Sequence, residues 1–356
     1  MASKLTTSNR AGWGFAIPGF GLIAMFIIAP FFFAFYLSLT DQRLVSPNPT
    51  RFVGFENYRA LLEMRVVTLS PERDDAGDVV RGDDGEIAYP RLRTITRNPE
   101  TPQYRGMREW ISWQSGEDRK VLIARDVVFL RALLNTFLFV VIVAPVQASF
   151  ALCLALLINQ RLGGINAFRA IYFMPVVISI VVVSLLWRFI YDGNDGLLNE
   201  ILSGLTFGAW EPIDWLGRTD TALPSIMAMS IWQAVGFHMV IWLAGLQTIS
   251  PTLYEAAEIE GASKWQTFRY ITWPGLRNTA VLILIVITMQ AFAVFAQIDV
   301  MTNGGPLDST QTLVFQTVER GYGKQDISGG STISVILFLI VLCISLVQTW
   351  LTREKS

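Results

Sequence analysis

Residues 132–160 read ALLNTFLFVVIVAPVQASFALCLALLINQ and contain no Asp, Glu, Lys or Arg. A helix of about 20 apolar residues can cross the hydrocarbon core of a bilayer, because it satisfies its backbone hydrogen bonds within itself. This stretch is long enough for that role. It therefore predicts a transmembrane helix.

Further stretches of the chain share this lack of charge. Four of them reach the length of a membrane span: 11–40, 221–254, 278–298 and 327–352. A fifth, 170–187, is shorter but continues past Arg188 to Tyr191, and an arginine near a helix end can extend its charge to the headgroups. Hydrophobic residues make up 52% of the chain and charged residues only 16%, against about 25% charged in soluble domains. We expect an all-α polytopic membrane protein with about six transmembrane helices.

Basic residues are distributed unequally between the two sides that six spans create. Lys and Arg in short loops favour the cytoplasmic side, whereas long loops are translocated largely regardless of charge. The side that holds both termini carries nine of them: Lys4, Arg10, Arg161, Arg169, Lys264, Arg269, Arg277, Arg353 and Lys355. With the long segment 41–131 excluded, the other side carries three: Arg218, Arg320 and Lys324. Both termini are therefore predicted to be cytoplasmic.

This topology predicts four parts of the chain. Residues 1–40 would form the cytoplasmic N-terminus and first transmembrane helix, and residues 41–131 a long extracytoplasmic loop. The Gly- and Asp-rich stretch 74–86 within that loop is expected to be a solvated loop or small cap. Residues 132–352 would form a five-helix core that includes a cytoplasmic loop at 250–276. Residues 353–356 would form the cytoplasmic C-terminus.

The composition argues against several kinds of chemistry. A net charge of −1 gives no overall field that favours nucleic acid. The single histidine, His238, leaves no material for a His-rich metal site or a catalytic cluster. No stretch matches the phosphate-binding pattern GxxxxGKS/T. We expect no catalytic residue, no metal and no cofactor bound by this chain.

The loop between the fourth and fifth spans is predicted to contain two short helices. Ser and Pro at 250–251 suit the start of a helix, and Gly261 would end it. The stretch 263–271 offers the second helix. Trp265 and Phe268, one turn apart, would give the loop an apolar face. This pattern indicates a docking surface, while three glutamates disfavour the alternative of a helix lying on the membrane.

Several motifs resemble a known family. Glu255-Ala256-Ala257, then Gly261 and Pro274, resemble the EAA loop of bacterial ABC importer permeases of type I. The stretches Val53-Gly54-Phe55-Glu56-Asn57-Tyr58 and Thr302-Asn303-Gly304-Gly305-Pro306 look like those of carbohydrate-uptake permeases of the maltose and glycerol-phosphate type. The resemblance covers most of the chain, with residues 64–126 looking inserted. It departs from the family at Glu260, where Asp is common.

The resemblance implies a function in ATP-driven, binding-protein-dependent import of a carbohydrate, an oligosaccharide, glycoside or related polyol. The loop would insert into a cleft on a separate ATPase through Glu255, Ala256, Ala257, Glu258, Gly261 and Pro274. The implied partners are a dimer of ATP-binding subunits using ATP and Mg, a second related permease and an extracytoplasmic solute-binding protein. The chain would then form half of a translocation pathway in a bacterial plasma membrane.

A sugar site is expected to combine amides with aromatic side chains, because sugars offer both hydroxyls and apolar ring faces. The resemblance implies pathway positions at Trp232, Gln233, Phe237, Gln290 and Val294. The alternative is that an intramembrane glutamine only bonds to a neighbouring helix. That alternative is the prediction for three other polar residues: Asn135, Gln147 and His238.

An ion-coupled secondary transporter is the main alternative function. It would need carboxylates within the membrane, often on broken helices. None of the five longest charge-free stretches contains one. A membrane-embedded enzyme is disfavoured by the single histidine, and a receptor or scaffold would differ from an importer in not copurifying with an ATPase.

Overall fold

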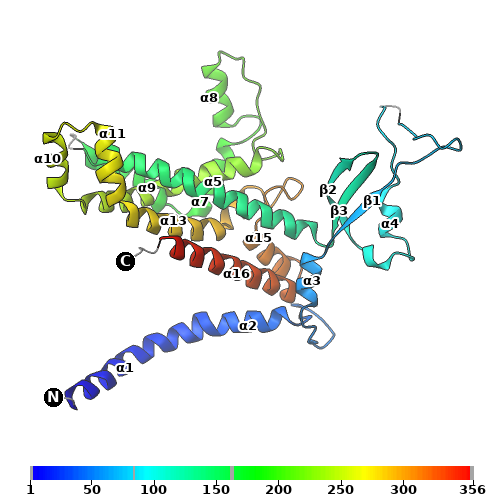
Figure 1. The fold of residues 1–356 in the computed structure, drawn as a ribbon, viewed down its shortest axis with the longest axis horizontal. Helices are drawn as coiled ribbons and strands as arrows, with labels where there is room; N and C mark the ends of the chain where they lie inside the picture. The colour runs from blue at the N-terminus through cyan, green and yellow to red at the C-terminus, as the bar shows by residue number, and fades with distance from the viewer. Residues whose placement is uncertain (1–2, 83–84, 161–163, 353–356) are drawn as a thin grey trace. The chain divides into compact units, whose positions relative to one another are not determined.

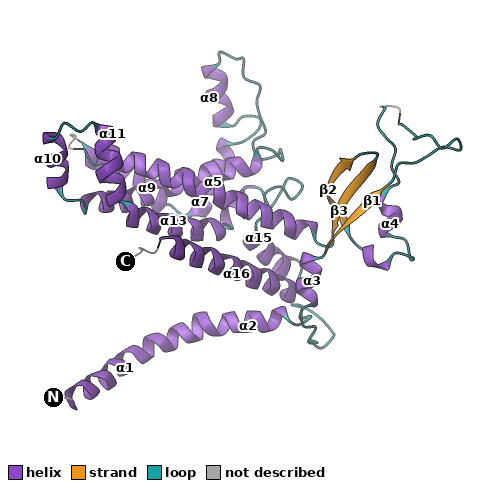
Figure 2. Cartoon of the chain, viewed as in Figure 1, coloured by secondary structure: helices purple, strands orange, loops and turns teal. Residues whose placement is uncertain are grey.

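The computed structural model describes residues 3–82, 85–160 and 164–352. The basic residue Arg161, the acidic pair 83–84 and the predicted cytoplasmic tail 353–356 lie outside the described residues. The chain forms two compact units: unit 1 contains Met1–Val127 and Thr317–Phe338, and unit 2 contains Val128–Gln316 and Leu339–Ser356. Figure 1 follows the chain by residue number, and Figure 2 shows that helices dominate it.

The described helices account for the predicted membrane spans. Four are long and apolar enough to cross a membrane: Trp13–Ser38, Val127–Ile158, Ala222–Gln247 and Ile327–Trp350. Two bent pairs, Ile165–Val177 with Ile180–Ile190 and Lys264–Gly275 with Arg277–Phe292, bring the number to six if each pair counts as one span. The prediction of a helical membrane protein with about six spans is confirmed.

In unit 1, the first span consists of α1 (Ser3–Ile23), the π-helical turn η1 (Ala24–Ile28) and α2 (Ala29–Ser38), followed after a loop by α3 (Glu56–Leu62). Asn57 Nδ2 donates hydrogen bonds to the carbonyls of Ser38 at 2.8 Å and Thr40 at 2.7 Å. The Tyr58 hydroxyl lies 2.7 Å from the Ser38 hydroxyl. These bonds satisfy carbonyl groups at the C-terminal end of the first span, so the motif at 53–58 caps that end of the helix.

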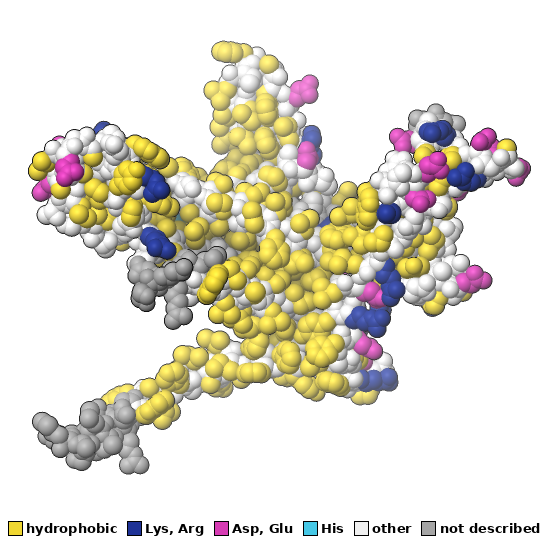
Figure 3. Space-filling view, in the orientation of Figure 1, with side chains coloured by type: hydrophobic (Ala, Val, Ile, Leu, Met, Phe, Trp, Pro, Cys, Tyr) yellow, Lys and Arg dark blue, Asp and Glu magenta, His cyan; other side chains and the backbone are white. Residues whose placement is uncertain are grey.

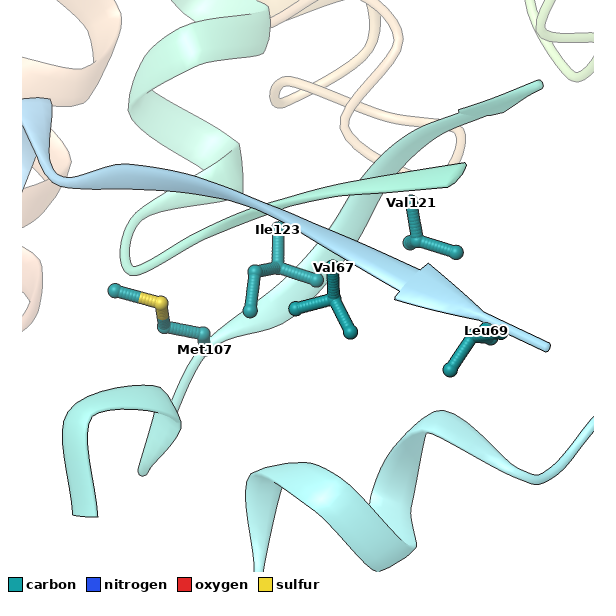
Figure 4. Packing of buried hydrophobic residues seen from close by; sticks show 5 residues of the cluster. All are labelled: Val67, Leu69, Met107, Val121 and Ile123. Atoms are coloured by element: carbon teal, nitrogen blue, oxygen red, sulfur yellow. The ribbon is translucent and has the colours of Figure 1, made fainter. Parts of the chain in front are cut away.

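The membrane core is all-α as predicted, but unit 1 also contains a small sheet that the sequence analysis did not predict. The antiparallel strands β1 (Met64–Leu69), β2 (Arg108–Ser115) and β3 (Asp118–Ala124) lie in the order β1-β3-β2. The connection between β1 and β2 contains α4 (Leu92–Thr96) and the 3-10 turn η2 (Pro102–Tyr104). Figure 4 shows the apolar cluster that holds this domain together: Val67, Leu69, Met107, Val121 and Ile123.

An ion pair links the sheet to the chain beside it. Glu63 accepts from Arg65 at 3.1 Å and lies 3.5 Å from Arg125, which follows β3. The hydrogen bond from Arg65 lowers the pKa of Glu63 below its ordinary value. Glu63 therefore remains a carboxylate that joins the two ends of the sheet domain.

Residues 72–82 and 85–88 belong to an arm that extends from the sheet domain. The N–H of Glu72 donates to the carbonyl of Ala88 at 2.9 Å, and the N–H of Val80 donates to the carbonyl of Glu72 at 2.8 Å. Most of its described side chains are exposed, and acidic and basic side chains gather at its tips in Figure 3. The arm is therefore held by backbone hydrogen bonds rather than by an apolar core of its own.

Unit 2 contains most of the remaining helices. Those before the predicted coupling loop are α5 (Val127–Ile158), α6 (Ile165–Val177), α7 (Ile180–Ile190), α8 (Leu197–Leu205) and α9 (Ala222–Gln247). The loop itself contains α10 (Pro251–Ile259), α11 (Lys264–Thr267), η3 (Phe268–Thr272) and α12 (Trp273–Gly275). Then follow α13 (Arg277–Phe292), α14 (Ala296–Met301) and α15 (Leu313–Val318), which ends in unit 1. The π-helical turn η4 (Glu319–Gly323) belongs to unit 1, and α16 (Ile327–Thr352) passes from unit 1 into unit 2 after Phe338.

Two predicted spans differ from continuous helices. The third bends by 98° between α6 and α7, where Ile178 has an extended backbone and follows Pro175 by three residues. The fifth ends at Phe292 instead of continuing to 298. Beyond that end, the carbonyl of Val294 accepts a hydrogen bond from the Thr312 hydroxyl at 3.1 Å. A side chain from another segment thus satisfies a backbone group that the helix leaves free.

Candidate functional site

A helical hairpin, residues 251–275, connects α9 to α13. Its first helix, α10, is followed by Gly261 in the left-handed backbone conformation, with φ +73°. The N–H of Ala262 donates to the carbonyl of Ala257 at 2.9 Å, and the N–H of Gly261 donates to the carbonyl of Glu258 at 3.1 Å. This Schellman motif satisfies carbonyls at the helix end and favours glycine at its left-handed position. The residues of the turn itself therefore determine its conformation.

The return segment of the hairpin begins at a capping box. Ser263 Oγ accepts from the N–H of Gln266 at 3.3 Å, and Gln266 Oε1 accepts from the N–H of Ser263 at 2.7 Å. The chain then runs through α11, η3 and α12. The Tyr254 hydroxyl lies 3.1 Å from the Thr272 hydroxyl, so a hydrogen bond joins the two arms.

The outer surface of the hairpin combines acidic and apolar side chains. None of the residues of α10 is buried, and Ile259 is 87% exposed. On the return arm, Trp265 is 70% exposed and stacks on Phe268 with ring centroids 5.8 Å apart. Figure 3 shows this end of unit 2 with acidic, basic and apolar atoms side by side. Exposed aromatic and aliphatic side chains on a loop are typical of a protein-docking surface.

The structure brings most of the predicted coupling residues together on this hairpin. Five of them lie on α10 or in the turn: Glu255, Ala256, Ala257, Glu258 and Gly261. Pro274 lies in α12, directly before the 66° bend into α13. Ser250 occupies the predicted N-cap position, but its hydroxyl contacts that of Thr252 and caps no backbone group. The coupling role of these residues stays a prediction.

A cavity of about 340 Å³ lies within unit 2, among α5, α6, α7, α9, α13 and α14. Small-molecule sites generally have volumes of about 300–1,000 Å³. Amide, hydroxyl, aromatic and aliphatic side chains form its wall, and none of its lining residues is charged. The lining residues are Phe139, Val143, Gln147, Val176, Ile180, Ser230, Gln233, Ala234, Phe237, Ile287, Gln290, Ala291, Val294 and Gln297.

Four of the five predicted pathway residues share this cavity: Gln233, Phe237, Gln290 and Val294. The fifth, Trp232, does not line it and instead packs against Trp187, with ring centroids 5.3 Å apart. Gln233 also donates to the carbonyl of Pro175 on α6 at 3.4 Å, so it links two helices as well as lining the cavity. The contact of these residues with a solute stays a prediction.

Sequence reasoning missed three polar residues of the wall: Gln147, Ser230 and Gln297. Gln147 Nε2 lies 2.9 Å from His238 Nδ1, so the two residues join α5 and α9 as predicted, but Gln147 also lines the cavity. Ser230 also lines it, and its buried hydroxyl has no hydrogen-bond partner in the part of the chain that the structure describes. Ser230 lies two helical turns before Phe237 on α9, so the two side chains share one face of the helix. This spacing is the signal that could have found Ser230.

One side of the cavity wall is open. Phe237 is 37% exposed, and Gln290 on α13 is also exposed, although both belong to apolar membrane helices. An exposed amide facing hydrocarbon lacks the hydrogen bonds that water would supply. The open wall is therefore suited to contact with further protein or with a water-filled pathway.

The motif at 302–306 belongs to a loop that α5 holds in place. Asn135 Nδ2 donates to the carbonyls of Ser309 at 2.9 Å and Gln311 at 3.0 Å. The hydroxyl of Thr310 donates to the carbonyl of Gly305 at 2.8 Å. Asn135 was expected to join two helices, but it fixes this loop instead.

Metal-binding residues are not clustered in the described ranges. Within 3–82, 85–160 and 164–352, no group of three or more His, Cys, Asp or Glu side chains could hold a metal ion.

Comparison with known proteins identifies the family of the chain. Residues 121–355 match the family described as "Binding-protein-dependent transport system inner membrane component". The chain belongs to this family. It is therefore an inner-membrane permease of a binding-protein-dependent transport system, and the multi-pass helical structure agrees with that assignment.

Several curated relatives of this permease carry sugar names. It is 33% identical to the trehalose/maltose transport system permease protein MalF of Thermococcus litoralis, over 74% of this chain and 84% of that protein. It is 32% identical to the lactose transport system permease protein LacF of Rhizobium radiobacter, over 76% and 90%. It is 31% identical to the diacetylchitobiose uptake system permease protein NgcF of Streptomyces coelicolor, over 67% and 71%.

Solved structures support the fold. A chain of a bacterial ABC transporter involved in the import of the acidic polysaccharide alginate matches with a TM-score of 0.70 and 18% identity, covering 100% of this chain and 99% of that one. A second structure of a bacterial alginate ABC transporter, in complex with alginate pentasaccharide-bound periplasmic protein, matches with a TM-score of 0.60 and 24% identity, covering 64% and 80%. At these identities, the likeness describes the fold of the permease.

Proposed function

We propose that the chain is one of two permease subunits of an ATP-driven importer, and that its cargo is an uncharged carbohydrate. The observation that carries the cargo assignment is the wall of the cavity, which combines glutamine amides with phenylalanine rings and contains no charged residue. Amides bind hydroxyl groups, and aromatic faces bind the apolar faces of sugar rings. The sugar names of the relatives agree with this assignment.

The open side of the cavity supports a second permease subunit. Exposed Phe237 and Gln290 would face lipid in a lone subunit. A related permease placed against this wall would cover the phenylalanine, give the amide hydrogen-bonding partners and complete the pathway.

The exposed hairpin supports an ATPase partner that uses ATP and Mg. Its surface presents Glu255 and Glu258 beside the exposed side chains of Ile259 and Trp265. Such a mixture of acidic and apolar groups suits a protein cleft better than a lipid surface. The excess of Lys and Arg in the short loops on one side of the membrane supports a cytoplasmic location for the hairpin and both termini.

Replacing Gln290 with leucine tests the cargo assignment. We expect the half-saturating solute concentration for uptake to rise about tenfold, because a lost hydrogen bond to the solute costs about 1.4 kcal/mol and an apolar side chain offers no substitute. The measurement is initial uptake into proteoliposomes that contain the complete complex, with tritium-labelled lactose, trehalose and diacetylchitobiose as probes.

A matched control is Gln348→Leu. Gln348 lies on α16 and donates to the Thr288 hydroxyl at 3.1 Å, but it does not line the cavity. The control should leave the half-saturating concentration within about twofold of the native value, since its interaction is a modest one between helices. Equal effects of the two substitutions, or uptake of none of the probes by the native complex, would count against the cargo assignment.

The arm of the sheet domain is proposed to contact the extracytoplasmic solute-binding protein. Replacing residues 74–86 with a short Gly-Ser linker should reduce uptake at low solute concentration, where delivery by the binding protein limits the rate. The apolar cluster of the sheet lies outside these residues, so the domain should remain folded. Undiminished uptake at low solute concentration by a normally assembled complex would show that the arm has no such role.

A further inference from the structure

The single histidine forms a buried pair with a cavity residue. His238 on α9 has no exposed surface. Its Nδ1 lies 2.9 Å from Gln147 Nε2 on α5 and 3.0 Å from the carbonyl oxygen of Ala234 on its own helix. Its Nε2 is buried and has no partner in the described residues. Among the described residues, both hydrogen-bond contacts of this imidazole therefore involve Nδ1.

Both contacts of Nδ1 can be hydrogen bonds in only one arrangement. The carbonyl of Ala234 only accepts, so it needs a proton on Nδ1. A protonated Nδ1 cannot accept from the Gln147 nitrogen, but it can donate to the Gln147 oxygen once the amide is turned over. In that arrangement, Nδ1–H is shared between two oxygens. It also leaves Nε2 as a bare acceptor, which is tolerated in a protein interior more readily than a bare N–H donor.

This arrangement fixes the amide of Gln147. Its oxygen faces the imidazole, so its NH2 group is left free for another acceptor. Gln147 is almost fully buried and lines the cavity described above. The NH2 group is therefore available to oxygen atoms of a molecule in the cavity.

A second polar group on the same wall points to a ligand. Ser230 is 7% exposed, lines the cavity and has a buried hydroxyl without a partner among the described residues. Ser230, Ala234 and His238 follow one another at intervals of four residues on α9, so they lie along one face of the helix. Buried polar groups in folded proteins are normally satisfied, so the Ser230 hydroxyl is open to a hydrogen bond with a molecule in the cavity.

We propose that Gln147 contacts the cargo by donating its NH2 group to a sugar oxygen, with Ser230 beside it, and that His238 is a positioning residue that holds the amide in this orientation. The inference rests on the proposed transport of an uncharged carbohydrate. It adds a specific polar contact on α5, which supplied no pathway residue in the sequence analysis.

The tautomer of His238 tests the positioning step independently of transport. Because the chain has one histidine, ¹⁵N-histidine labelling of the purified full chain in nanodiscs gives signals from a single imidazole. The native chain should show the tautomer with the proton on Nδ1. Predominance of the tautomer protonated on Nε2 would overturn the assignment of His238.

Uptake by the reconstituted complex tests the contact with the cargo, using the same three tritium-labelled sugars. Gln147→Leu should raise the half-saturating concentration about tenfold, with a smaller fall in the maximal rate, because one hydrogen bond to the cargo is lost. Gln147→Glu should behave similarly, since a carboxylate has nearly the same shape but no NH2 group. Gln348→Leu is the control for a glutamine that joins helices away from the cavity.

A double substitution separates positioning from general stability. His238→Phe alone should raise the half-saturating concentration by a similar factor, but it should add little to Gln147→Leu, because the histidine acts through the amide. His238→Asn should restore much of the native value, since its amide N–H can replace Nδ1–H. Additive effects of His238→Phe and Gln147→Leu would show that His238 only stabilises the helices.

The outcomes distinguish this inference from the function on which it rests. Sugar uptake by the native complex with an unchanged half-saturating concentration in Gln147→Leu would overturn the inference alone. Failure of the native complex to take up any of the sugars would overturn the proposed cargo and the contact together.

Discussion

Replacing Glu255 with lysine is expected to lower ATP-driven uptake at least about 30-fold. No residue of α10 is buried, so the substitution leaves the fold of the hairpin intact. Its effect should therefore fall on the surface that docks the ATPase. Breaking a buried charge contact at a protein interface costs about 2–5 kcal/mol, and the lower value corresponds to about 30-fold in affinity. The measurement is uptake together with copurification of the ATPase.

The same substitution at another exposed helix provides the control. Glu200 lies on α8, is exposed and is separate from the hairpin. Glu200→Lys should copurify with the ATPase and transport at close to the native rate. Native uptake by Glu255→Lys would remove the hairpin from the coupling pathway, and equal losses in both variants would point to a general effect of charge reversal.

Replacing Gly236 with valine is expected to prevent correct assembly of the membrane core. A Cβ atom at this position would overlap the carbonyl oxygen of Tyr172 and lie 3.0 Å from the Cα of Phe173, both on α6. These are backbone atoms, so α6 and α9 would have to move apart. Overpacking of this kind costs about 1–3 kcal/mol and can cost more where a backbone must shift. The measurement is the yield and thermal unfolding temperature of the permease in detergent.

Gly204→Ala is the matched control for this prediction. Gly204 lies within α8, and a Cβ atom there would have no neighbour within 4 Å. Alanine should therefore be accepted and even favour the helix by about 1 kcal/mol. A normal yield and unfolding temperature for Gly236→Val would mean that α6 and α9 do not approach as closely as described.

Hydropathy located the membrane helices because their length and lack of charge are local properties. It did not locate their breaks. The bend near Ile178 has a local signal in Pro175, but the end of α13 at Phe292 has neither Gly nor Pro beside it. The carbonyl of Val294 is instead satisfied by Thr312, eighteen residues later, which is a tertiary contact that no local pattern reveals.

The sheet was missed for a different reason. The charged and Gly-rich composition of the arm indicated a solvated loop. The strands on either side of it do not alternate strictly. In β2, Trp110 and Ile111 are adjacent, and the register with β3 shifts between Glu109 and Ile111, so no period-two pattern marked the strand.

The cavity shows what the resemblance could and could not predict. Gln233 and Phe237 are one turn apart and share a face of α9, whereas Trp232 is rotated by about 100° from Gln233 on the same helix. It therefore points toward Trp187. The position of Gln147 on the cavity wall was missed because it depends on how α5 packs against α9. Gln147 contacts His238 on α9, and the two are 91 residues apart in the sequence.

The energy source for uptake by the complete complex distinguishes an ATP-driven importer from an ion-coupled transporter. In proteoliposomes containing the permease, its partner permease, the ATPase and the binding protein, sugar uptake should require ATP and the binding protein. It should not respond to a proton or sodium gradient. Uptake driven by an ion gradient in the absence of the ATPase would contradict the account and favour a secondary transporter.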